Sequence, residues 1–181
     1  EGADALVVSD YGEGVVEGEV FDEVLRIMKE GNLPVFVDSR YRIEHFRHAD
    51  TLVPNEPELW GASKLDVSSE EGLERAGRWL LQNTASRATA VKRGKRGMAL
   101  FVEGEPAFKL KAYGLEEVAD RTGAGDTVLA AYSLARSVGG DFRDAMTVAN
   151  TCGGIKVTKS GTAVVTAREL RQALEKMEQA K

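Results

Sequence analysis

The sequence is poor in the features that would place it outside the ordinary globular proteins. Its 181 residues include a single cysteine, Cys152, which excludes an internal disulfide and fits a reducing, cytosolic setting. No apolar run approaches the roughly 18 residues that a membrane span requires. The first ten residues, EGADALVVSD, lack the basic start and the apolar core of a signal peptide. These absences predict a cytoplasmic protein without a membrane partner.

Basic residues are also in short supply, with 24 lysines and arginines against 29 acidic residues and a formal net charge of −5. This balance argues against a general binder of nucleic acids or anionic membranes. The basic stretch KRGKRG, residues 92–97, is short and isolated in an acidic chain, so it predicts no nucleic-acid partner. With 43% hydrophobic and 29% charged residues, the chain has the composition of one globular domain with its own core.

Hydrophobic patterning predicts an α/β protein. A buried strand over Ala5–Ser9, a helix over Glu19–Glu30 and a second buried strand over Val35–Asp38 form a βαβ unit, which implies a parallel sheet. Four further strands are predicted over residues 51–55, 88–94, 97–103 and 106–112, the last two as a hairpin-like edge. Further helices are predicted from a capping box at Ser68 and Glu71, over Gly125–Val138, over Phe142–Lys156, and from a capping box at Thr166 and Glu169.

A glycine-rich motif, ADRTGAGDT over residues 119–127, leads into one of these predicted helices. Gly123, Ala124 and Gly125 present backbone N–H groups without large side chains, and a helix N-terminus adds partial positive charge, so the loop can bind an anion. Asp126, in the first helical turn, would repel a bound phosphate unless it has a chemical task, such as accepting a proton from an attacking hydroxyl. The alternative for a generic G-x-G-D stretch is that the acid caps the helix and the glycines form a turn.

The longer pattern from Asp120 to Thr127 resembles the signature of the ribokinase/PfkB family of carbohydrate kinases. Three other stretches are similar to family motifs in the same order: VPNEPE from residue 53, VKRGKRG from residue 91, and ANTCGGIKVTKSGT from residue 149. The resemblance covers residues 1–181 as the C-terminal nucleotide-binding and catalytic portion of a longer kinase domain. It implies a ribokinase-like, Rossmann-like three-layer sandwich with a mostly parallel sheet, without the N-terminal part and the β-lid that covers the sugar.

The resemblance also implies catalytic roles for the glycine-rich motif. Asp126 is the expected base for a sugar hydroxyl, and Gly123, Ala124 and Gly125 are the expected anion hole for the transferring phosphoryl group. Asp120 and the carbonyl of Thr122 are expected to bind a monovalent cation, K+, which orders that hole. The stretch from residue 149 is expected to form a helix of small residues beneath adenine, followed by a cation-binding turn.

The nucleotide ATP and Mg2+ are the other implied cofactors. Asn55 and Glu58, in an N-x-x-E arrangement, are expected to act on Mg2+ through water, since this ion keeps much of its hydration shell. Taken alone, Glu58 is more often a solvated helix acid, and the alternative for Lys92 and Arg93 is a solvated basic strand end. The residues expected beside the nucleotide are Asn55, Glu58, Lys92, Arg93, Gly94, Gly97 and Asn150.

The implied function is ATP-dependent phosphorylation of a hydroxyl on a sugar or sugar phosphate. The segments SDYGEG and VDSR, residues 9–14 and 37–40, resemble those of the heptose-phosphate kinase branch, which acts on D-glycero-D-manno-heptose 7-phosphate in ADP-heptose synthesis. That branch usually has lysine where this chain has Glu13, and Arg40 could partly replace the lost positive charge. A non-catalytic nucleotide-binding module is the alternative function. The expected assembly is a homo-oligomer or a pairing with the missing N-terminal half.

Overall fold

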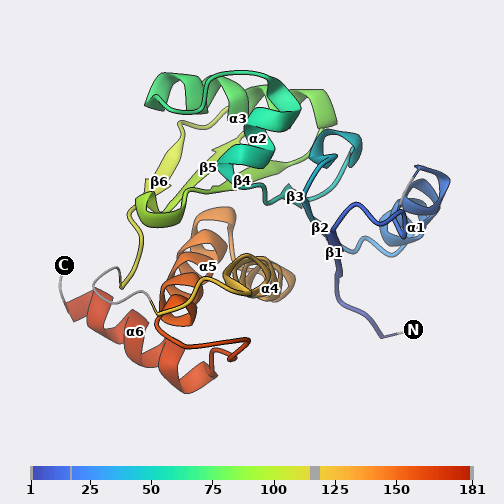
Figure 1. Ribbon diagram of the computed structural model, residues 1–181. Coiled ribbons are helices and arrows are strands. Elements are labelled where there is room, and N and C mark those ends of the chain that lie inside the picture. The colour runs from blue at the N-terminus through green and yellow to red at the C-terminus, as the bar shows by residue number, and fades with distance from the viewer. Residues whose placement is uncertain (1, 17, 115–118, 180–181) are drawn as a thin grey trace. The chain divides into compact units, whose positions relative to one another are not determined.

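The computed structural model describes residues 2–16, 18–114 and 119–179 (Figure 1). The chain divides into two units. The sheet unit comprises Glu1–Arg93 and Ala99–Lys109, and the helical unit comprises Gly94–Met98 and Leu110–Lys181. Each unit contains its own group of candidate functional residues.

Six strands form one sheet, in the order β1-β2-β3-β4-β5-β6. Their bounds are β1 Leu6–Asp10, β2 Val35–Ser39, β3 Thr51–Leu52, β4 Ala88–Lys92, β5 Met98–Val102 and β6 Phe108–Leu110. The first four strands pair in parallel, with Val8 opposite Val37 and Leu52 opposite Thr89. β5 and β6 are neighbours at one edge, where the sequence predicts them. The parallel strands confirm the βαβ interpretation of the hydrophobic pattern.

The third strand is shorter than the predicted span of residues 51–55. Regular pairing ends at Leu52, and Pro54 has no N–H to donate to a ladder. One further contact continues the pairing, since the N–H of Lys92 donates to the carbonyl of Pro54 at 2.8 Å and Asn55 forms an isolated parallel bridge with Lys92. This bridge brings Asn55 to the carboxyl end of β4.

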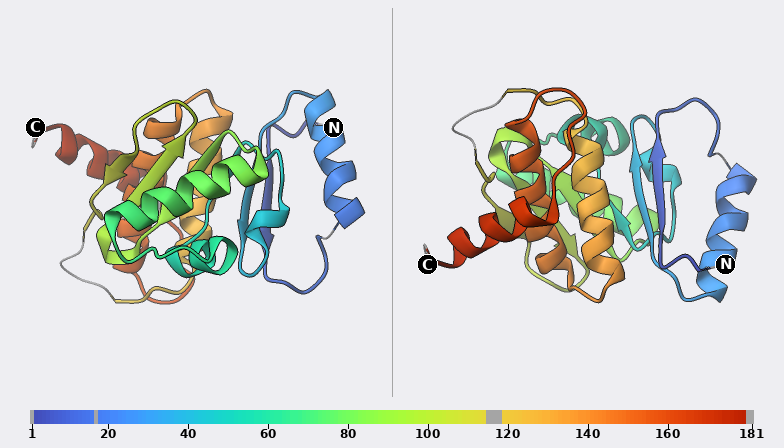
Figure 2. Two further views of the ribbon diagram at one scale, coloured as in Figure 1. Left: turned by 90° about the horizontal axis from the view of Figure 1, so that it is seen from above. Right: turned by 90° about the horizontal axis from the view of Figure 1, so that it is seen from below.

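Three helices belong to the sheet unit: α1 (Gly18–Glu30), α2 (Glu56–Ser63) and α3 (Glu70–Thr84). Their apolar side chains share one core with alternate strand residues, among them Val35 and Val37 of β2. Alternation follows because successive side chains of a strand point to opposite faces of the sheet. Figure 2 shows α1 next to the β1 edge. The ring of Phe21 in α1 meets that of Phe46, which follows β2, edge-on at a centroid distance of 4.9 Å.

The start of α3 differs from the prediction by one residue. The capping box predicted at Ser68 and Glu71 is wrong, because the cap is Ser69, whose Oγ accepts the N–H of Gly72 at 3.0 Å. The N–H of Ser68 instead donates to Asp66 Oδ1 at 2.9 Å, in a turn that precedes the helix. Two adjacent serines offer two caps, and the turn at Asp66 selects the second.

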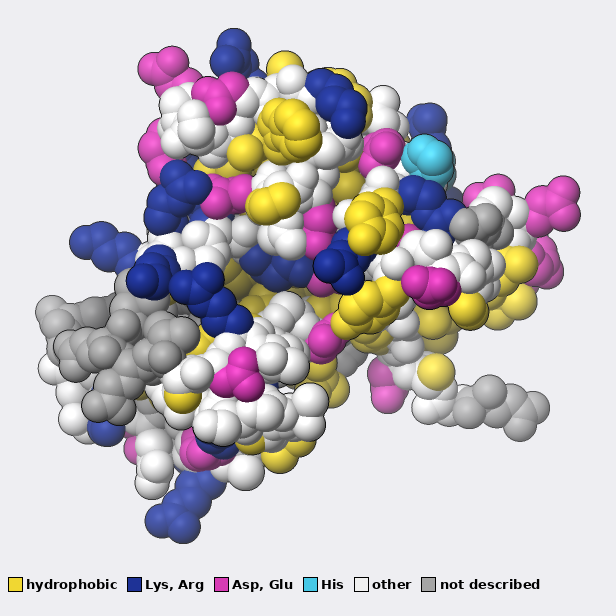
Figure 3. Space-filling model, viewed as in Figure 1, with side chains coloured by type: hydrophobic (Ala, Val, Ile, Leu, Met, Phe, Trp, Pro, Cys, Tyr) yellow, Lys and Arg dark blue, Asp and Glu magenta, His cyan; other side chains and the backbone are white. Residues whose placement is uncertain are grey.

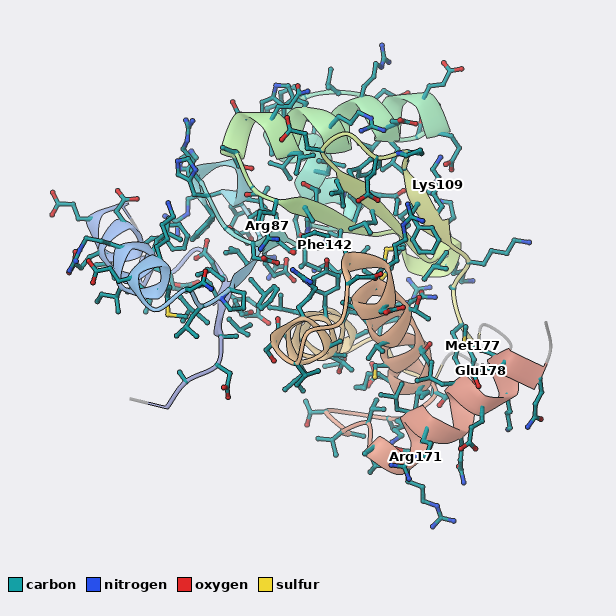
Figure 4. The ribbon with its side chains drawn as sticks, turned by 180° about the vertical axis from the view of Figure 1, so that it is seen from behind. Arg87, Lys109, Phe142, Arg171, Met177 and Glu178 are labelled. Atoms are coloured by element: carbon teal, nitrogen blue, oxygen red, sulfur yellow. The ribbon has the colours of Figure 1, made fainter. Side chains whose placement is uncertain are left out.

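The helical unit contains α4 (Ala124–Ser137), α5 (Phe142–Val157) and α6 (Ala167–Gln179). A Cβ on Gly153 of α5 would lie 2.8 Å from Val128 Cγ2 of α4, so this glycine permits close packing of the two helices. Met177 of α6, labelled in Figure 4, contacts α5 through its sulfur, which accepts a hydrogen bond from Thr151 Oγ1 at 3.6 Å.

The capping box predicted at Thr166 and Glu169 is confirmed at the start of α6. The N–H of Thr166 donates to Glu169 Oε2 at 2.8 Å, and the N–H of Glu169 donates to Thr166 Oγ1 at 3.3 Å. Reciprocal bonds of this kind satisfy backbone donors that a helix start would otherwise leave unpaired.

The surface over α2 and α3 mixes positive, negative and hydrophobic side chains, as Figure 3 shows for one face. Trp60 of α2 is half exposed there, and the ammonium of Lys64 lies 5.5 Å from the centroid of its ring. Across the described ranges, no helix combines the length and the apolar character that crossing a bilayer would need.

Candidate functional site

In the sheet unit, polar side chains from three elements meet at the carboxyl ends of the strands. Asp38 lies near the end of β2, Glu58 in the first turn of α2, and Lys92 at the end of β4. The ammonium of Lys92 forms an ion pair with Asp38 Oδ2, and the two side chains are only 13% and 15% exposed. Carboxyl ends of parallel strands are where ligands bind in open α/β sheets. We call Asp38, Asn55, Glu58 and Lys92 the strand-end cluster.

Asn55 and Glu58 are held together by a capping box at the start of α2. Asn55 Oδ1 accepts the N–H of Glu58 at 2.8 Å, while the two oxygens of Glu58 accept the backbone N–H and the Nδ2 of Asn55, each at 2.6 Å. The predicted helices do not include α2, although N-x-x-E is itself a helix-start signal. The motif that the resemblance assigns to Mg2+ therefore also builds the helix that presents it.

The donor set of the strand-end cluster fits a magnesium ion that is reached through water. Both carboxylate oxygens of Glu58 already accept hydrogen bonds from Asn55. Within the ranges that the structure describes, no group of three or more His, Cys, Asp or Glu side chains is placed to hold a metal ion directly. Carboxylate and amide oxygens suit a hard cation that retains several of its waters.

The carboxyl of Glu58 is unusual within this cluster. Burial, followed by the nearby Asp38 carboxylate, raises the pKa of Glu58 from 4.5 to about 7, although the Lys92 ammonium opposes the shift. A raised carboxyl pKa means that the folded protein binds more protons than the unfolded chain over this pH range. The protonated form is stabilising below the unfolded pKa, and the stabilisation is lost as the pH rises through the folded pKa.

This shift predicts a pH dependence of stability in the metal-free protein. As the pH rises from about 4.5 to 7, the Glu58 carboxyl should lower the free energy of unfolding by about 2 kcal/mol. Glu58→Gln should flatten this part of the profile, because its amide does not titrate. Urea denaturation at a series of pH values, with chelator present, measures it, and Glu71→Gln, which removes an exposed carboxylate of α3, is the control. A variant with an unchanged slope would contradict the assignment to Glu58.

Arg93 is buried rather than free at the strand end. It is 7% exposed, its Nε lies 3.1 Å from Glu56 Oε1, and its Nη2 forms an ion pair with Glu70. The alternative of a solvated basic strand end is therefore wrong for Arg93, as it is for the shielded Lys92. Arg93 links the starts of α2 and α3, and its predicted place beside the nucleotide stays a prediction.

In the helical unit, the glycine-rich motif forms a turn that begins α4. Gly123 has a φ of +72°, in the left-handed region, and its carbonyl accepts both the N–H and the Oγ1 of Thr127, at 3.0 and 2.8 Å. The N–H of Ala124 donates to the carbonyl of Arg121 at 3.1 Å, so an anion would have to displace this bond to use that donor. Asp126 lies in the first helical turn with its side chain exposed.

Asp120 connects this turn to the segment that follows α5. Its Oδ1 accepts the N–H of Thr122 at 2.9 Å and the Oγ1 of Thr122 at 2.8 Å, while its Oδ2 accepts the N–H of Gly161 at 2.9 Å. The hydrogen bonds from Thr122, then that from Gly161 and finally the charge of Lys156 lower the pKa of Asp120 to about 2. The carboxylate is thus ionised and already surrounded by donors.

Lys156 of α5 is a functional candidate that the sequence interpretation missed. The side chain is 1% exposed, and its ammonium donates to the carbonyl of Gly161 at 2.9 Å. Its Cε lies 3.9 Å from where a Cβ on Gly123 would be. A lysine inside the otherwise small and apolar run CGGIKV was the signal that could have found it.

Asn150, expected near the adenine base, is 8% exposed on α5. Its Nδ2 donates to the carbonyl of Lys111 at 2.8 Å, which ties α5 to the segment after β6. Gly154 supports the same contact region, since a Cβ there would lie 2.2 Å from the carbonyl oxygen of Tyr113. The small residues of this helix therefore permit close packing within the protein, and their place beneath adenine stays a prediction.

Gly94 and Gly97 lie in a short loop that follows β4. The N–H of Gly97 donates to the carbonyl of Gly94 at 3.0 Å, and both residues have positive φ, +87° and +55° respectively. A Cβ on Gly97 would lie 2.0 Å from the carbonyl oxygen of Leu110, whereas a Cβ on Gly94 would meet nothing within 4 Å. The loop therefore needs glycine at position 97 for a close backbone approach.

Comparison with known families places this chain among the carbohydrate kinases. The model of the pfkB family carbohydrate kinases matches residues 1–168, and the chain belongs to this family. The chain is 35% identical over 173 residues to the bifunctional protein HldE of Desulfatibacillum aliphaticivorans, which is 95% of this chain and 35% of that protein. It is 37% identical over 171 residues to HldE of Alcanivorax borkumensis, which is 94% of this chain and 35% of that protein. The chain thus spans about a third of the length of these relatives.

Solved structures show the same fold at low sequence identity. The structure of Arabidopsis thaliana ribokinase complexed with ribose and ATP has a TM-score of 0.84 at 22% identity, covering 96% of this chain and 56% of that chain. Phosphofructokinase-2 from Escherichia coli in complex with potassium has a TM-score of 0.83 at 15% identity, with 96% and 57% covered. The predicted ribokinase-like α/β fold with a mostly parallel sheet is confirmed.

Proposed function

We propose that this chain carries the nucleotide-binding and phosphoryl-transfer residues of an ATP-dependent kinase that phosphorylates a hydroxyl of a sugar or sugar phosphate. The observation that carries the proposal is the turn at Gly123, which leads into α4 and leaves the Asp126 side chain exposed in the first turn. An exposed carboxylate beside a helix N-terminus can accept a proton from an attacking hydroxyl.

The glycine-rich turn supplies the electrostatic part of the reaction. Gly123, Ala124 and Gly125 offer backbone N–H groups at the positive end of α4, where charge on the transferring phosphoryl group would be stabilised. Ala124 would exchange its bond to the carbonyl of Arg121 for one to the phosphoryl group. A cation beside Asp120 would keep this turn and the segment after α5 in place.

The strand-end cluster supplies the magnesium part of the reaction. Asn55 and Glu58 would hold the hydration shell of Mg2+, and Lys92 would lie beside the nucleotide. Bound Mg2+ neutralises phosphate charge during transfer. The capping box fixes the orientation of Glu58 before any ligand arrives, and this pre-organisation supports the role.

For the sugar, we propose a phosphorylated heptose, D-glycero-D-manno-heptose 7-phosphate. The similarity to HldE proteins supports this choice, and so does the loop that follows β2. Arg40 is exposed there, its N–H donates to the carbonyl of Asp10 at 2.9 Å, and its guanidinium lies 5.7 Å from the ring centroid of Tyr41. Tyr41 covers Gly12, where a Cβ would lie 2.7 Å from its ring. Arg40 thus lies beside the loop that carries Glu13 and can supply the positive charge that Glu13 lacks.

Calorimetry and phosphorus NMR test the proposal on the full chain. Titration with Mg-ATP should show saturable binding, and addition of heptose 7-phosphate should yield ADP and a new sugar phosphate signal. Binding of Mg-ATP without transfer to any sugar would favour the alternative, a non-catalytic nucleotide-binding module. Should transfer require a separate N-terminal half or a second copy of the chain, mixing experiments would reveal that partner.

A further inference from the structure

Lys156 is a buried cation in a place where the fold has no obvious use for a charge. It follows Gly153, Gly154 and Ile155 on α5, and it is 1% exposed. Removing an ammonium from water is unfavourable unless polar groups compensate for the lost hydration. The compensating groups that the structure shows are the carbonyl of Gly161, at 2.9 Å from Nζ, and the Asp120 carboxylate, which lies within electrostatic range.

These partners are the ones that the family resemblance assigns to K+. The resemblance implies a monovalent cation held by Asp120, by the carbonyl of Thr122 and by the turn after α5, and Gly161 belongs to that turn. Its carbonyl accepts the Lys156 ammonium, and its N–H donates to Asp120 Oδ2 at 2.9 Å. The other oxygen of Asp120 accepts two donors from Thr122.

A free K+ does not fit this arrangement. It would compete with the tethered ammonium for the carbonyl of Gly161 and for the negative charge of Asp120, and the two positive charges would repel each other. The ammonium needs no ligand to hold it, because its side chain is buried and it donates to the carbonyl of Gly161. The side chain also runs beside Gly123, with Cε 3.9 Å from the position of a Cβ.

We propose that the ammonium of Lys156 is a built-in cation that takes the place of K+, so that the cation site of this chain is independent of monovalent salt. The inference deepens the proposed function. It rests on that function in one respect, namely that the cation site serves to order the turn at Gly123. Direct binding of a phosphate by Lys156 is a different role, and the almost complete burial of the side chain argues against it.

The experiment compares the full chain with Lys156→Met, which removes the ammonium and keeps the length of the side chain. The midpoint of thermal unfolding is measured in K+ and in tetramethylammonium at equal ionic strength, and thallium NMR measures binding of Tl+ as a mimic of K+. Lys159→Met is the matched control. Its ammonium donates to the carbonyl of Val164 at 2.7 Å and pairs with Glu169 at 2.6 Å.

The wild-type protein and Lys159→Met should have the same midpoint in both salts and bind no Tl+. In Lys156→Met, K+ at about ten times its Kd should raise the midpoint by about 3–5 °C. Tl+ should bind to this variant and be displaced by K+. A folded Lys156→Met that stays indifferent to K+ would overturn the proposal. So would K+-displaceable Tl+ binding to the wild type, which decides the matter even if the variant fails to fold.

These measurements need no turnover, so they separate this proposal from the proposed function. A wild type that binds no Tl+ and phosphorylates no sugar, even when mixed with the N-terminal half, would contradict the kinase proposal and support the tethered cation. A wild type that phosphorylates sugar only in K+ and binds Tl+ would support the kinase proposal and contradict the tethered cation.

Discussion

Replacing Asp126 with asparagine is expected to lower kcat about 100-fold or more while leaving the affinity for Mg-ATP nearly unchanged. The asparagine side chain keeps the size of the acid but cannot accept the proton of the attacking hydroxyl. Nucleotide affinity should survive because Asp126 is exposed at the first turn of α4 rather than buried in its packing. Single-turnover kinetics together with calorimetric titration of Mg-ATP separate the two effects.

The matched control is Asp144→Asn, which removes the acid from the first turn of the next helix, α5. Both substitutions remove one negative charge from a helix N-terminus, so they share the small loss of a favourable charge–dipole interaction. Only Asp126→Asn should also abolish proton acceptance. Equal losses of kcat and nucleotide affinity in Asp126→Asn would mean that the acid is structural, and the assignment as base would fail.

Sequence patterning predicted the strands and helices well where buried side chains recur at the regular spacing of a strand or a helix. Val35 and Val37 lie in the shared core, as a buried strand requires, and the strand over residues 35–38 was predicted from them. The helix α2 was missed because its eight residues include a single buried side chain, Leu59, so it has no apolar stripe to detect. The serine that caps α3 was misplaced by one position, since the turn that decides between the two serines involves Asp66.

Residues of the candidate site were likewise predicted where they belong to one local motif, and missed where their role depends on a partner distant in the sequence. Asp120, Gly123 and Asp126 follow one another in a single motif, so their resemblance to the family signature can be seen in the sequence without any tertiary information. Asp38 and Lys156 were not singled out as site residues, because the significance of each depends on a distant partner. Asp38 acquires its role from Lys92, 54 residues away, and Lys156 from Asp120, which lies on a different segment. A lone charge in an apolar run signals burial, but not what it is buried against.

Gly97→Ala is expected to destabilise the protein strongly, by about 3–5 kcal/mol in the free energy of unfolding. Two effects combine at this position. The residue has a φ of +87°, and a Cβ would lie 2.0 Å from the carbonyl oxygen of Leu110 and 2.6 Å from the nitrogen of Ala112. Both atoms belong to backbone, which cannot move aside as the end of a flexible side chain can.

Gly94→Ala isolates the first of these effects, the strain of a side chain at positive φ, because its Cβ would lie in open space. Its φ is +55° and nothing lies within 4 Å, so the expected loss is only about 1 kcal/mol. Urea denaturation of the two variants measures the difference, which reports the cost of pushing residues 110–112 away.

The segment of residues 110–112 includes Lys111, whose carbonyl accepts a hydrogen bond from Asn150, so Gly97→Ala should also weaken Mg-ATP binding if Asn150 borders the base. Equal destabilisation by both substitutions would show that backbone strain alone requires glycine in this loop. A loss of Mg-ATP affinity in Gly94→Ala without loss of stability would instead place that residue directly against the nucleotide.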